Sequence, residues 1–156
     1  SSKENQIRNF EFHINVAEEL NKPLIIHCRD SFSDVFDILS KKDSNNPIIL
    51  HSWTGGNKWT KRFAELGVYF SISGIVTYDT AHDLQAAVTK VPRDKLLLET
   101  DVPYLAPQPF KGKRNNPTYI KYTGAKVAEL LNLTPRELSN ITVTNTNNML
   151  NRESNE

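Results

Sequence analysis

The sequence predicts an α/β fold of the (β/α)8 TIM-barrel type, and three observations carry this prediction. Four short apolar runs recur along the chain, a helical pattern follows most of them, and metal-ligand side chains end several of them. A doubly wound sheet is the alternative, but its usual glycine-rich phosphate turn, GxGxxG or GxxxxGK[ST], is absent. We therefore prefer the barrel, in which chemistry is collected from several strand ends.

Length and composition predict a single globular domain over residues 1–156. The net charge is +1, with 38% hydrophobic and 24% charged residues, so bulk charge favours no class of partner. No apolar run approaches the roughly 18 residues that a membrane span needs, and we expect no membrane partner. The single cysteine, Cys28, cannot form an internal disulfide. We therefore expect a cytoplasmic protein.

The chain opens on a predicted amphipathic helix, because apolar residues recur every three or four positions from Ile7 to Leu20. This helix should end before Pro23. Four runs are then predicted to be parallel strands buried on both faces, because they are almost continuously apolar. They span residues 23–27, 47–51, 68–72 and 95–99.

Helices are predicted between the strands. Residues 32–39 and 59–66 carry apolar side chains at helical spacing, and Gly67 closes the second of these segments. Leu84 and Val88 indicate a third helix from about residue 79 to residue 90. Each predicted helix connects two strands of the sheet, which is the βα alternation of a parallel fold.

A long loop over residues 102–116 follows the last strand and precedes two final helices. Asn116 is the predicted N-cap of the first helix, with Pro117 at its first position. The side chains expected to face the sheet are Ile120, Val127, Leu130 and Leu131. Thr134 and Glu137 form a capping box that opens the last helix, which reaches about Leu150.

Potential metal ligands follow three of the predicted strands. His27 ends the first, His51 ends the second, and Asp101 follows the fourth. Imidazole nitrogens and carboxylate oxygens are ligands that hydrolytic Zn, Mn or related divalent ions use, and such an ion lowers the pKa of a bound water. A lone histidine at a strand end is more often structural, but repetition at equivalent positions favours a site. His13 and His82 lie in helical patterns and are predicted to be surface residues.

Several motifs resemble the TatD-type metal-dependent deoxyribonucleases. They are IIHCRD at 25–30, LHSWTGG at 50–56, LLLETDVPYLAP at 96–107 and KGKRNNP at 111–117. The resemblance extends from about Gln6 to Leu150 and includes the order and spacing of the motifs. It implies an amidohydrolase-type barrel with one or two divalent ions (Mg, Mn or Zn) at its C-terminal face.

The resemblance also implies an activity and a set of roles. The expected reaction is hydrolysis of DNA phosphodiester bonds by a metal-activated water, in the 3′–5′ exonuclease mode on single-stranded ends. His27 and His51 match two metal ligands of the family. Asp101 matches the aspartate that touches the metal and can accept a proton from the attacking water. Glu99 is expected just outside the ligands, where it can orient a histidine.

Three basic residues are candidate phosphate contacts. Arg29 and Arg114 can bind phosphate oxygens in a bidentate manner, and Lys113 stands beside Arg114 in the matching motif. The alternatives are that Arg29 pairs with Asp30, and that Lys113 and Arg114 are solvated loop charges.

Three other residues of these motifs have open or structural interpretations. Trp53 either stacks on a base or packs in the core. Gly55 is expected to permit a tight backbone, and Cys28 is predicted to be a packed thiol.

The sequence also departs from the family pattern, because the HxH strand and the later glutamate ligand of the family are absent. We therefore expect roughly the last four βα units of the barrel, without its N-terminal strands and with two exposed sheet edges. The expected partners are DNA and either a missing N-terminal half or a second copy of the chain. The alternatives are a catalytically incomplete metal-binding or interaction fragment, or a related metal-dependent hydrolase acting on another ester or amide.

Overall fold

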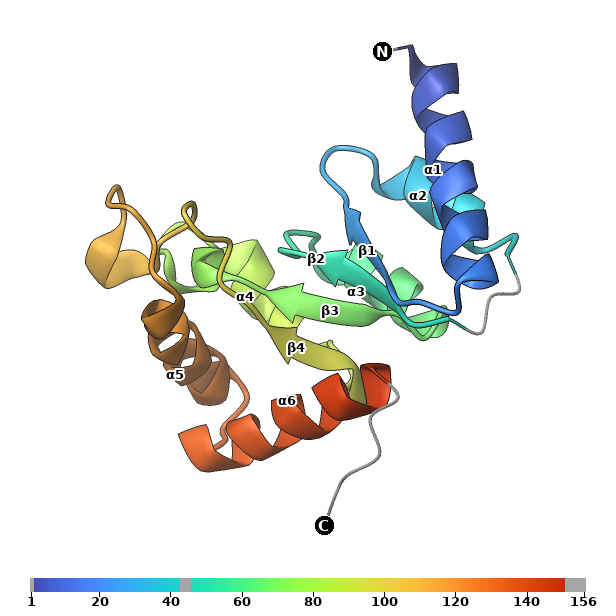
Figure 1. Ribbon diagram of the computed structural model, residues 1–156. Coiled ribbons are helices and arrows are strands. Elements are labelled where there is room, and N and C mark those ends of the chain that lie inside the picture. The colour runs from blue at the N-terminus through green and yellow to red at the C-terminus, as the bar shows by residue number, and fades with distance from the viewer. Residues whose placement is uncertain (1, 43–45, 151–156) are drawn as a thin grey trace.

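A four-stranded parallel sheet forms the centre of the molecule in a computed structural model that describes residues 2–42 and 46–150 (Figure 1). The strands lie in chain order, β1-β2-β3-β4, and their register pairs His27 with His51. They are β1 (Leu24–His27), β2 (Ile48–His51), β3 (Tyr69–Ile72) and β4 (Leu96–Leu98). The α/β class and all four predicted strands are confirmed.

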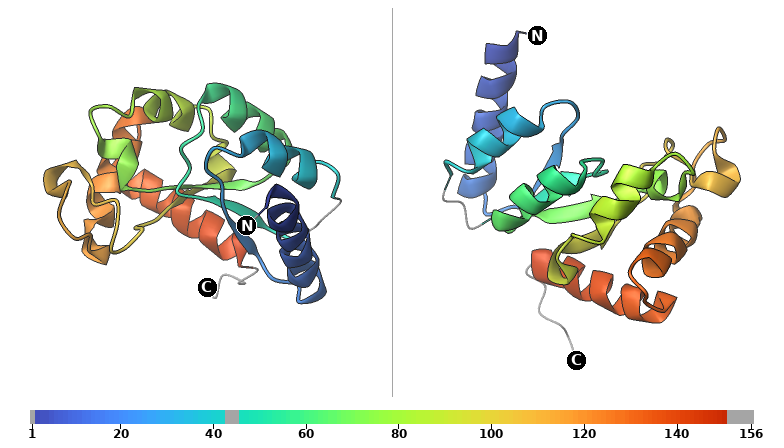
Figure 2. Two further views of the ribbon diagram at one scale, coloured as in Figure 1. Left: turned by 90° about the horizontal axis from the view of Figure 1, so that it is seen from above. Right: turned by 180° about the vertical axis from the view of Figure 1, so that it is seen from behind.

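Six α-helices surround the sheet within the described ranges. They are α1 (Lys3–Glu19), α2 (Phe32–Leu39), α3 (Asn57–Glu65), α4 (His82–Val88), α5 (Ile120–Leu130) and α6 (Pro135–Met149). Helices α2, α3 and α4 lie over one face of the sheet, whereas α6 runs alongside β4 (Figure 2). Across the described residues, no helix combines the length and apolar character needed to cross a membrane.

The two faces of the sheet are buried to different extents. Leu50, Phe70 and Leu96 belong to the main core that the helices cover, while Tyr69 and Leu97 pack with Met149 of α6 on the opposite side. The prediction that the strands are buried on both faces is confirmed for β3, whose four residues are all buried. It is wrong for β1, where Ile25 is 68% exposed. Because β1 is an outer strand and α6 lies at the other edge, that face of β1 is uncovered.

The predicted helices needed three corrections, two of their bounds and one of the face that a residue occupies. The segment expected as one helix from residue 79 to 90 contains only α4, and a 3-10 helix, Gly74–Thr77, precedes it. The Asn116 side chain caps a 3-10 turn, Pro117–Tyr119, and α5 begins at Ile120 rather than Pro117. Ile120 does not face the core and is 37% exposed, because it stands at the open N-terminal end of α5.

Local capping signals were predicted correctly. Helix α1 ends at Glu19, before Pro23, and the capping box at the start of α6 is complete. Thr134 donates its backbone N–H and its hydroxyl to the Glu137 carboxylate, each at 2.7 Å. These hydrogen bonds hold the pKa of the Glu137 carboxyl below its usual range.

Asn145 fastens α6 to the segment that leads into β4. Its buried Nδ2 donates to the backbone oxygens of Arg93 and Leu96, both at 2.8 Å. We expect Asn145→Ala to lower the free energy of unfolding by about 1–3 kcal/mol, because two carbonyls lose their donor. Urea denaturation measures this change. Asn148→Ala, at an exposed position of the same helix, is the matched control, and equal stability of the two variants would contradict the assignment.

Candidate metal centre

The three predicted ligands lie together at the carboxyl ends of the strands. His27 and His51 are register partners on β1 and β2, and their ring centroids are 5.8 Å apart. Asp101 follows β4, and its Oδ1 lies 3.8 Å from His51 Nε2. The parallel arrangement therefore brings residues from three separate strand ends to one place.

A pocket of about 420 Å³ opens at this edge of the sheet, and we call it the site pocket. His27, Arg29 and Asp101 contribute to its wall, so three residues selected from the sequence border one cavity. The remaining lining residues are Cys28, Ser52, Thr54, Ile75, Tyr78 and Leu105.

Glu99 contacts the side of His51 that faces away from Asp101. Its Oε1 lies 2.8 Å from His51 Nδ1, and both side chains are largely buried. This oxygen has no hydrogen bond within the described residues, so the two atoms are close without the alignment of a hydrogen bond. With Nδ1 engaged, Nε2 is the nitrogen directed at Asp101. Glu99 thus lies beside the ring nitrogen at which the predicted orienting role would act, although the contact lacks hydrogen-bond alignment.

Left-handed backbone conformations follow the strand ends that carry the candidate ligands. Asp30, Ser52 and Leu105 have φ angles of 55°, 45° and 55°. Such angles are uncommon for side chains other than glycine and cluster at functional sites. The loop at Leu105 also packs tightly, because a Cβ added to Gly74 would lie 2.2 Å from the Leu105 carbonyl oxygen.

The predicted phosphate contacts differ in their position. Arg29 lines the site pocket, whereas Lys113 and Arg114 are exposed and do not line it. Arg29 Nε lies 3.8 Å from Asp30 Oδ2, and both side chains are almost fully solvated. The pairing named as the alternative is thus present, but such exposed pairs contribute little stability.

Asn115, which sequence reasoning missed, anchors the loop that carries Lys113 and Arg114. It is buried, its N–H donates to the Pro103 oxygen at 2.9 Å, and its Nδ2 donates to the Tyr104 oxygen at 2.6 Å. The sequence feature that could have identified Asn115 is its position inside the KRNNP motif. Asn115 therefore ties the basic segment to the loop after Asp101.

The structure selects the packing interpretation for Trp53. Its side chain is 1% exposed, and Nε1 donates to Thr60 Oγ1 at 2.9 Å. Gly55 is required beside it, because an added Cβ would lie 2.1 Å from the indole ring. Cys28 is buried as predicted, and burial raises the pKa of its thiol.

Tyr78 is a second residue of the site pocket that the sequence did not indicate. Its hydroxyl donates to the Ala106 oxygen at 2.9 Å, and burial raises its pKa. No periodic pattern singled it out, because it follows a short 3-10 helix. Ser52 and Thr54, in contrast, lay inside a quoted motif, and Ser52 Oγ is 2.7 Å from Ser73 Oγ.

The imidazole and carboxylate groups at the site pocket are ligand types that suit a divalent ion. Two of them, His51 and Asp101, lie close enough to contact the same ion. The 3.8 Å between His51 Nε2 and Asp101 Oδ1 allows both to contact a metal, since zinc lies about 2.0–2.2 Å from such atoms. No three His, Cys, Asp or Glu side chains of residues 2–42 and 46–150 converge on one metal position. The residues therefore fit a metal ion in the chemistry of their donor atoms and in the spacing of one pair, His51 and Asp101. His27 lies beside His51.

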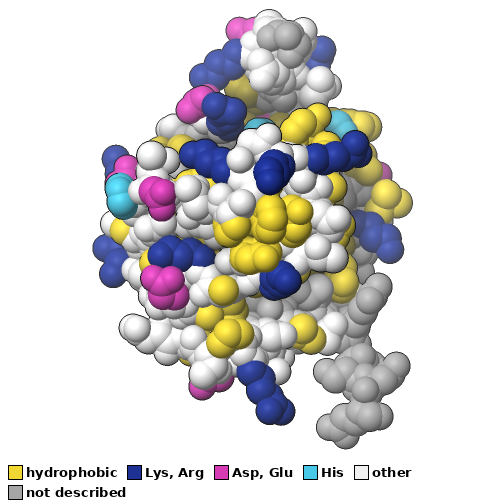
Figure 3. Space-filling model, turned by 90° about the vertical axis from the view of Figure 1, so that its left-hand side faces the viewer, with side chains coloured by type: hydrophobic (Ala, Val, Ile, Leu, Met, Phe, Trp, Pro, Cys, Tyr) yellow, Lys and Arg dark blue, Asp and Glu magenta, His cyan; other side chains and the backbone are white. Residues whose placement is uncertain are grey.

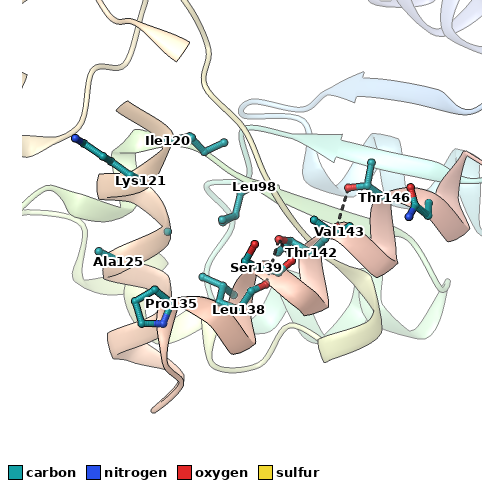
Figure 4. Close-up of a pocket in the computed structure, with 12 residues that line it drawn as sticks. Leu98, Ile120, Lys121, Ala125, Pro135, Leu138, Ser139, Thr142, Val143 and Thr146 are labelled. Carbon is teal, nitrogen blue, oxygen red and sulfur yellow. Dashed lines mark hydrogen bonds between the residues drawn. The ribbon is translucent and has the colours of Figure 1, made fainter. Parts of the chain in front are cut away.

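A separate groove of about 420 Å³ lies between α5, α6 and β4 (Figure 4). Leu98, Ile120 and Val143 are among the apolar side chains directed into it, together with serine and threonine hydroxyls. Its described lining contains no His, Cys, Asp or Glu. The groove is therefore not a candidate metal centre.

Comparison with known proteins identifies related sequences over nearly all of the chain. The sequence model of the family described as "TatD related DNase" matches residues 1–151. The "Uncharacterized metal-dependent hydrolase YabD" of Bacillus subtilis is 40% identical over 93% of this chain and 57% of the relative. "Uncharacterized metal-dependent hydrolase YcfH" of Escherichia coli K12 is 39% identical over 92% of this chain and 55% of the relative. The chain thus spans little more than half the length of these curated relatives.

Two solved structures have the same fold. The Escherichia coli TatD homologue YjjV gives a TM-score of 0.86 at 24% identity, covering 97% of this chain and 60% of that one. A TatD family hydrolase from Entamoeba histolytica gives 0.82 at 18% identity, covering 98% and 59%. At these sequence identities, the similarity to the two structures shows a shared fold.

Proposed function

Because the chain belongs to the TatD-related DNase family, we propose that it takes part in metal-dependent hydrolysis of DNA phosphodiester bonds. The observation that carries the proposal is His51, held between Glu99 and Asp101 at 2.8 and 3.8 Å beside the site pocket. The proposed substrate is the end of a single strand, processed in the 3′–5′ direction.

Four residues at or beside the site pocket have chemical roles in this proposal. His27, His51 and Asp101 would hold a divalent ion of Mg, Mn or Zn, with one or two ions in a complete site. When bound, the ion supplies an acidified water near neutral pH. The Asp101 carboxylate would accept the proton of the attacking water, and Glu99 would orient the His51 ring.

The basic residues would bind the DNA backbone. Arg29 lies at the wall of the site pocket, where its guanidinium can contact the reacting phosphate. Arg114 and Lys113 are exposed beyond the pocket and would contact phosphates farther along the strand.

We further propose that the sheet represents the last four βα units of a (β/α)8 barrel. Both β1 and β4 are outer strands here, and the exposed Ile25 leaves an apolar side chain uncovered. Parallel sheets are normally covered on both faces. Complementary strands, from an N-terminal half or a second copy, would close the barrel and supply further metal ligands.

A second candidate function is that of a catalytically incomplete metal-binding or interaction fragment. It is favoured by the absence of three convergent ligands among the described residues. The two candidates differ in turnover, because the second binds metal without hydrolysing DNA.

Hydrolysis of a labelled single-stranded oligonucleotide tests the proposal. We expect the purified chain to degrade the strand in the presence of Mg, Mn or Zn, with no turnover in EDTA. Oligonucleotides labelled at the 3′ or the 5′ end report the polarity, and a nitrophenyl ester tests the hydrolysis of another bond. Metal content is measured in parallel. Bound metal without turnover would favour the second candidate.

A further inference from the structure

The segment between Asp101 and Glu129 has a composition unlike the rest of the chain. Residues 102–128 contain no Asp or Glu, although the whole chain has nearly equal numbers of acidic and basic residues. The remaining chain is therefore net acidic. The cations of the segment are Lys111, Lys113, Arg114, Lys121 and Lys126, and its aromatic residues are Tyr104, Phe110, Tyr119 and Tyr122.

Three of these aromatic rings form one cluster, which we call the aromatic platform: Phe110, Tyr119 and Tyr122. Phe110 and Tyr119 are stacked, with centroids 4.0 Å apart and planes inclined by 6°. Tyr122 meets Phe110 edge-on at 5.2 Å. All three side chains are only partly buried. Stacked, accessible rings of this kind offer surfaces to which further flat groups can add.

Cations lie beside the platform, on the helix and in the loop that carry its rings. Lys121 Nζ lies 5.2 Å from the centroid of Tyr122, and Lys113 and Arg114 are exposed in the adjoining loop. The side of the molecule that carries this segment, at the left of Figure 1, has hydrophobic side chains in its middle with Lys and Arg around them (Figure 3). Asp and Glu side chains lie around the periphery of that view, away from the central hydrophobic side chains (Figure 3). This surface is therefore complementary to an anion that carries flat apolar groups.

Hydrogen bonds fix the platform relative to the site pocket. The N–H of Gln108 donates to Thr77 Oγ1 at 2.7 Å, and the Tyr78 hydroxyl donates to the Ala106 oxygen. Lys111, next to Phe110, places its Nζ 4.5 Å from the centroid of Tyr78. Because Tyr78 lines the site pocket, Lys111 connects the pocket to the platform.

We propose that the aromatic platform binds single-stranded DNA whose end lies in the site pocket. Bases stack on Phe110, Tyr119 and Tyr122, while phosphates contact Lys111 and Lys121. Stacking requires unpaired bases, so the platform selects single strands over duplex. The identity of the strand as DNA rests on the proposed function, whereas the platform itself rests on the contacts of this segment.

Fluorescence anisotropy with a labelled single-stranded oligothymidine, in EDTA so that no hydrolysis occurs, tests the platform. We expect Tyr122→Leu to weaken binding roughly fivefold to a hundredfold, with little change in salt dependence. Lys121→Ala should instead reduce the slope of log Kd against log salt by about 0.7, the value for one phosphate contact on a single strand. Circular dichroism checks the fold, and Phe110→Leu replaces Tyr122→Leu if the latter is unfolded.

Matched controls separate the platform from general surface effects. Phe12→Leu alters an exposed aromatic residue of α1, and Lys61→Ala an exposed lysine of α3, and both should bind as the unaltered chain does. An abasic strand of equal charge tests stacking directly. The unaltered chain should prefer the oligothymidine, and Tyr122→Leu should lose that preference.

Two outcomes would overturn the platform: equal affinity for abasic and thymidine strands, or equal losses in the control variants. Failure of the proposed function is distinguishable from these outcomes. Platform-dependent binding without hydrolysis in metal would reject the hydrolase role and keep the platform. Hydrolysis that is unaffected by Tyr122→Leu, together with unchanged binding, would reject the platform alone.

Discussion

Replacing His51 by alanine is expected to reduce metal-dependent hydrolysis roughly a hundredfold or more and to weaken metal binding. The side chain contacts Glu99 through Nδ1 and faces Asp101 through Nε2, so its loss removes both a ligand and the group that Glu99 positions. Loss of a partner outside the ligand set alone typically costs about tenfold to a hundredfold. Initial rates at several metal concentrations and calorimetric metal titration measure the two effects.

His82→Ala is the matched control for this experiment. His82 is exposed at the first residue of α4 and does not line the site pocket. Its replacement should leave metal affinity and rate unchanged. If His51→Ala also retained both values, the assignment of His51 as a ligand would be wrong.

Trp53→Ala is expected to lower the free energy of unfolding by about 3–5 kcal/mol, the usual cost of deleting a large buried aromatic side chain. The indole is enclosed by Phe32, Phe63 and Phe70, with ring centroids 5.2, 5.5 and 5.3 Å away. It also donates a buried hydrogen bond to Thr60, which the variant loses. Urea denaturation followed by circular dichroism measures the change.

Trp59→Ala controls for the loss of any tryptophan. Trp59 lies in α3 and is partly exposed, so its removal leaves a smaller cavity and should cost clearly less. Equal losses in the two variants would contradict the central position of Trp53 in the core. A reduced affinity of correctly folded Trp53→Phe for single-stranded DNA would instead support the base-stacking interpretation that its burial argues against.

Local sequence signals predicted much of the fold. The apolar runs identified all four strands, Pro23 marked the end of α1, and Thr134 with Glu137 identified the start of α6. These features depend on neighbouring residues in the chain, so the sequence alone contains them. The exposed face of β1 at Ile25 was not predictable in this way, because it depends on which elements lie beside the strand.

The candidate site was predictable in its residue types but not in its contacts. His27 and His51 could be selected because each ends a strand, and parallel strands place their carboxyl ends together. Tyr78 could not, because its place at the pocket wall involves a contact with Ala106, which lies far from it in the sequence.

The sequence by itself determined the order of strands and helices, the family, and the three potential ligands His27, His51 and Asp101. Only the tertiary structure decided that Glu99 contacts His51 and that Trp53 is buried. It likewise decided that Lys111 joins the aromatic platform to the site pocket through Tyr78. The physical reason is that periodicity and capping act over a few neighbouring residues, whereas these contacts join residues that only chain packing brings within a few ångströms.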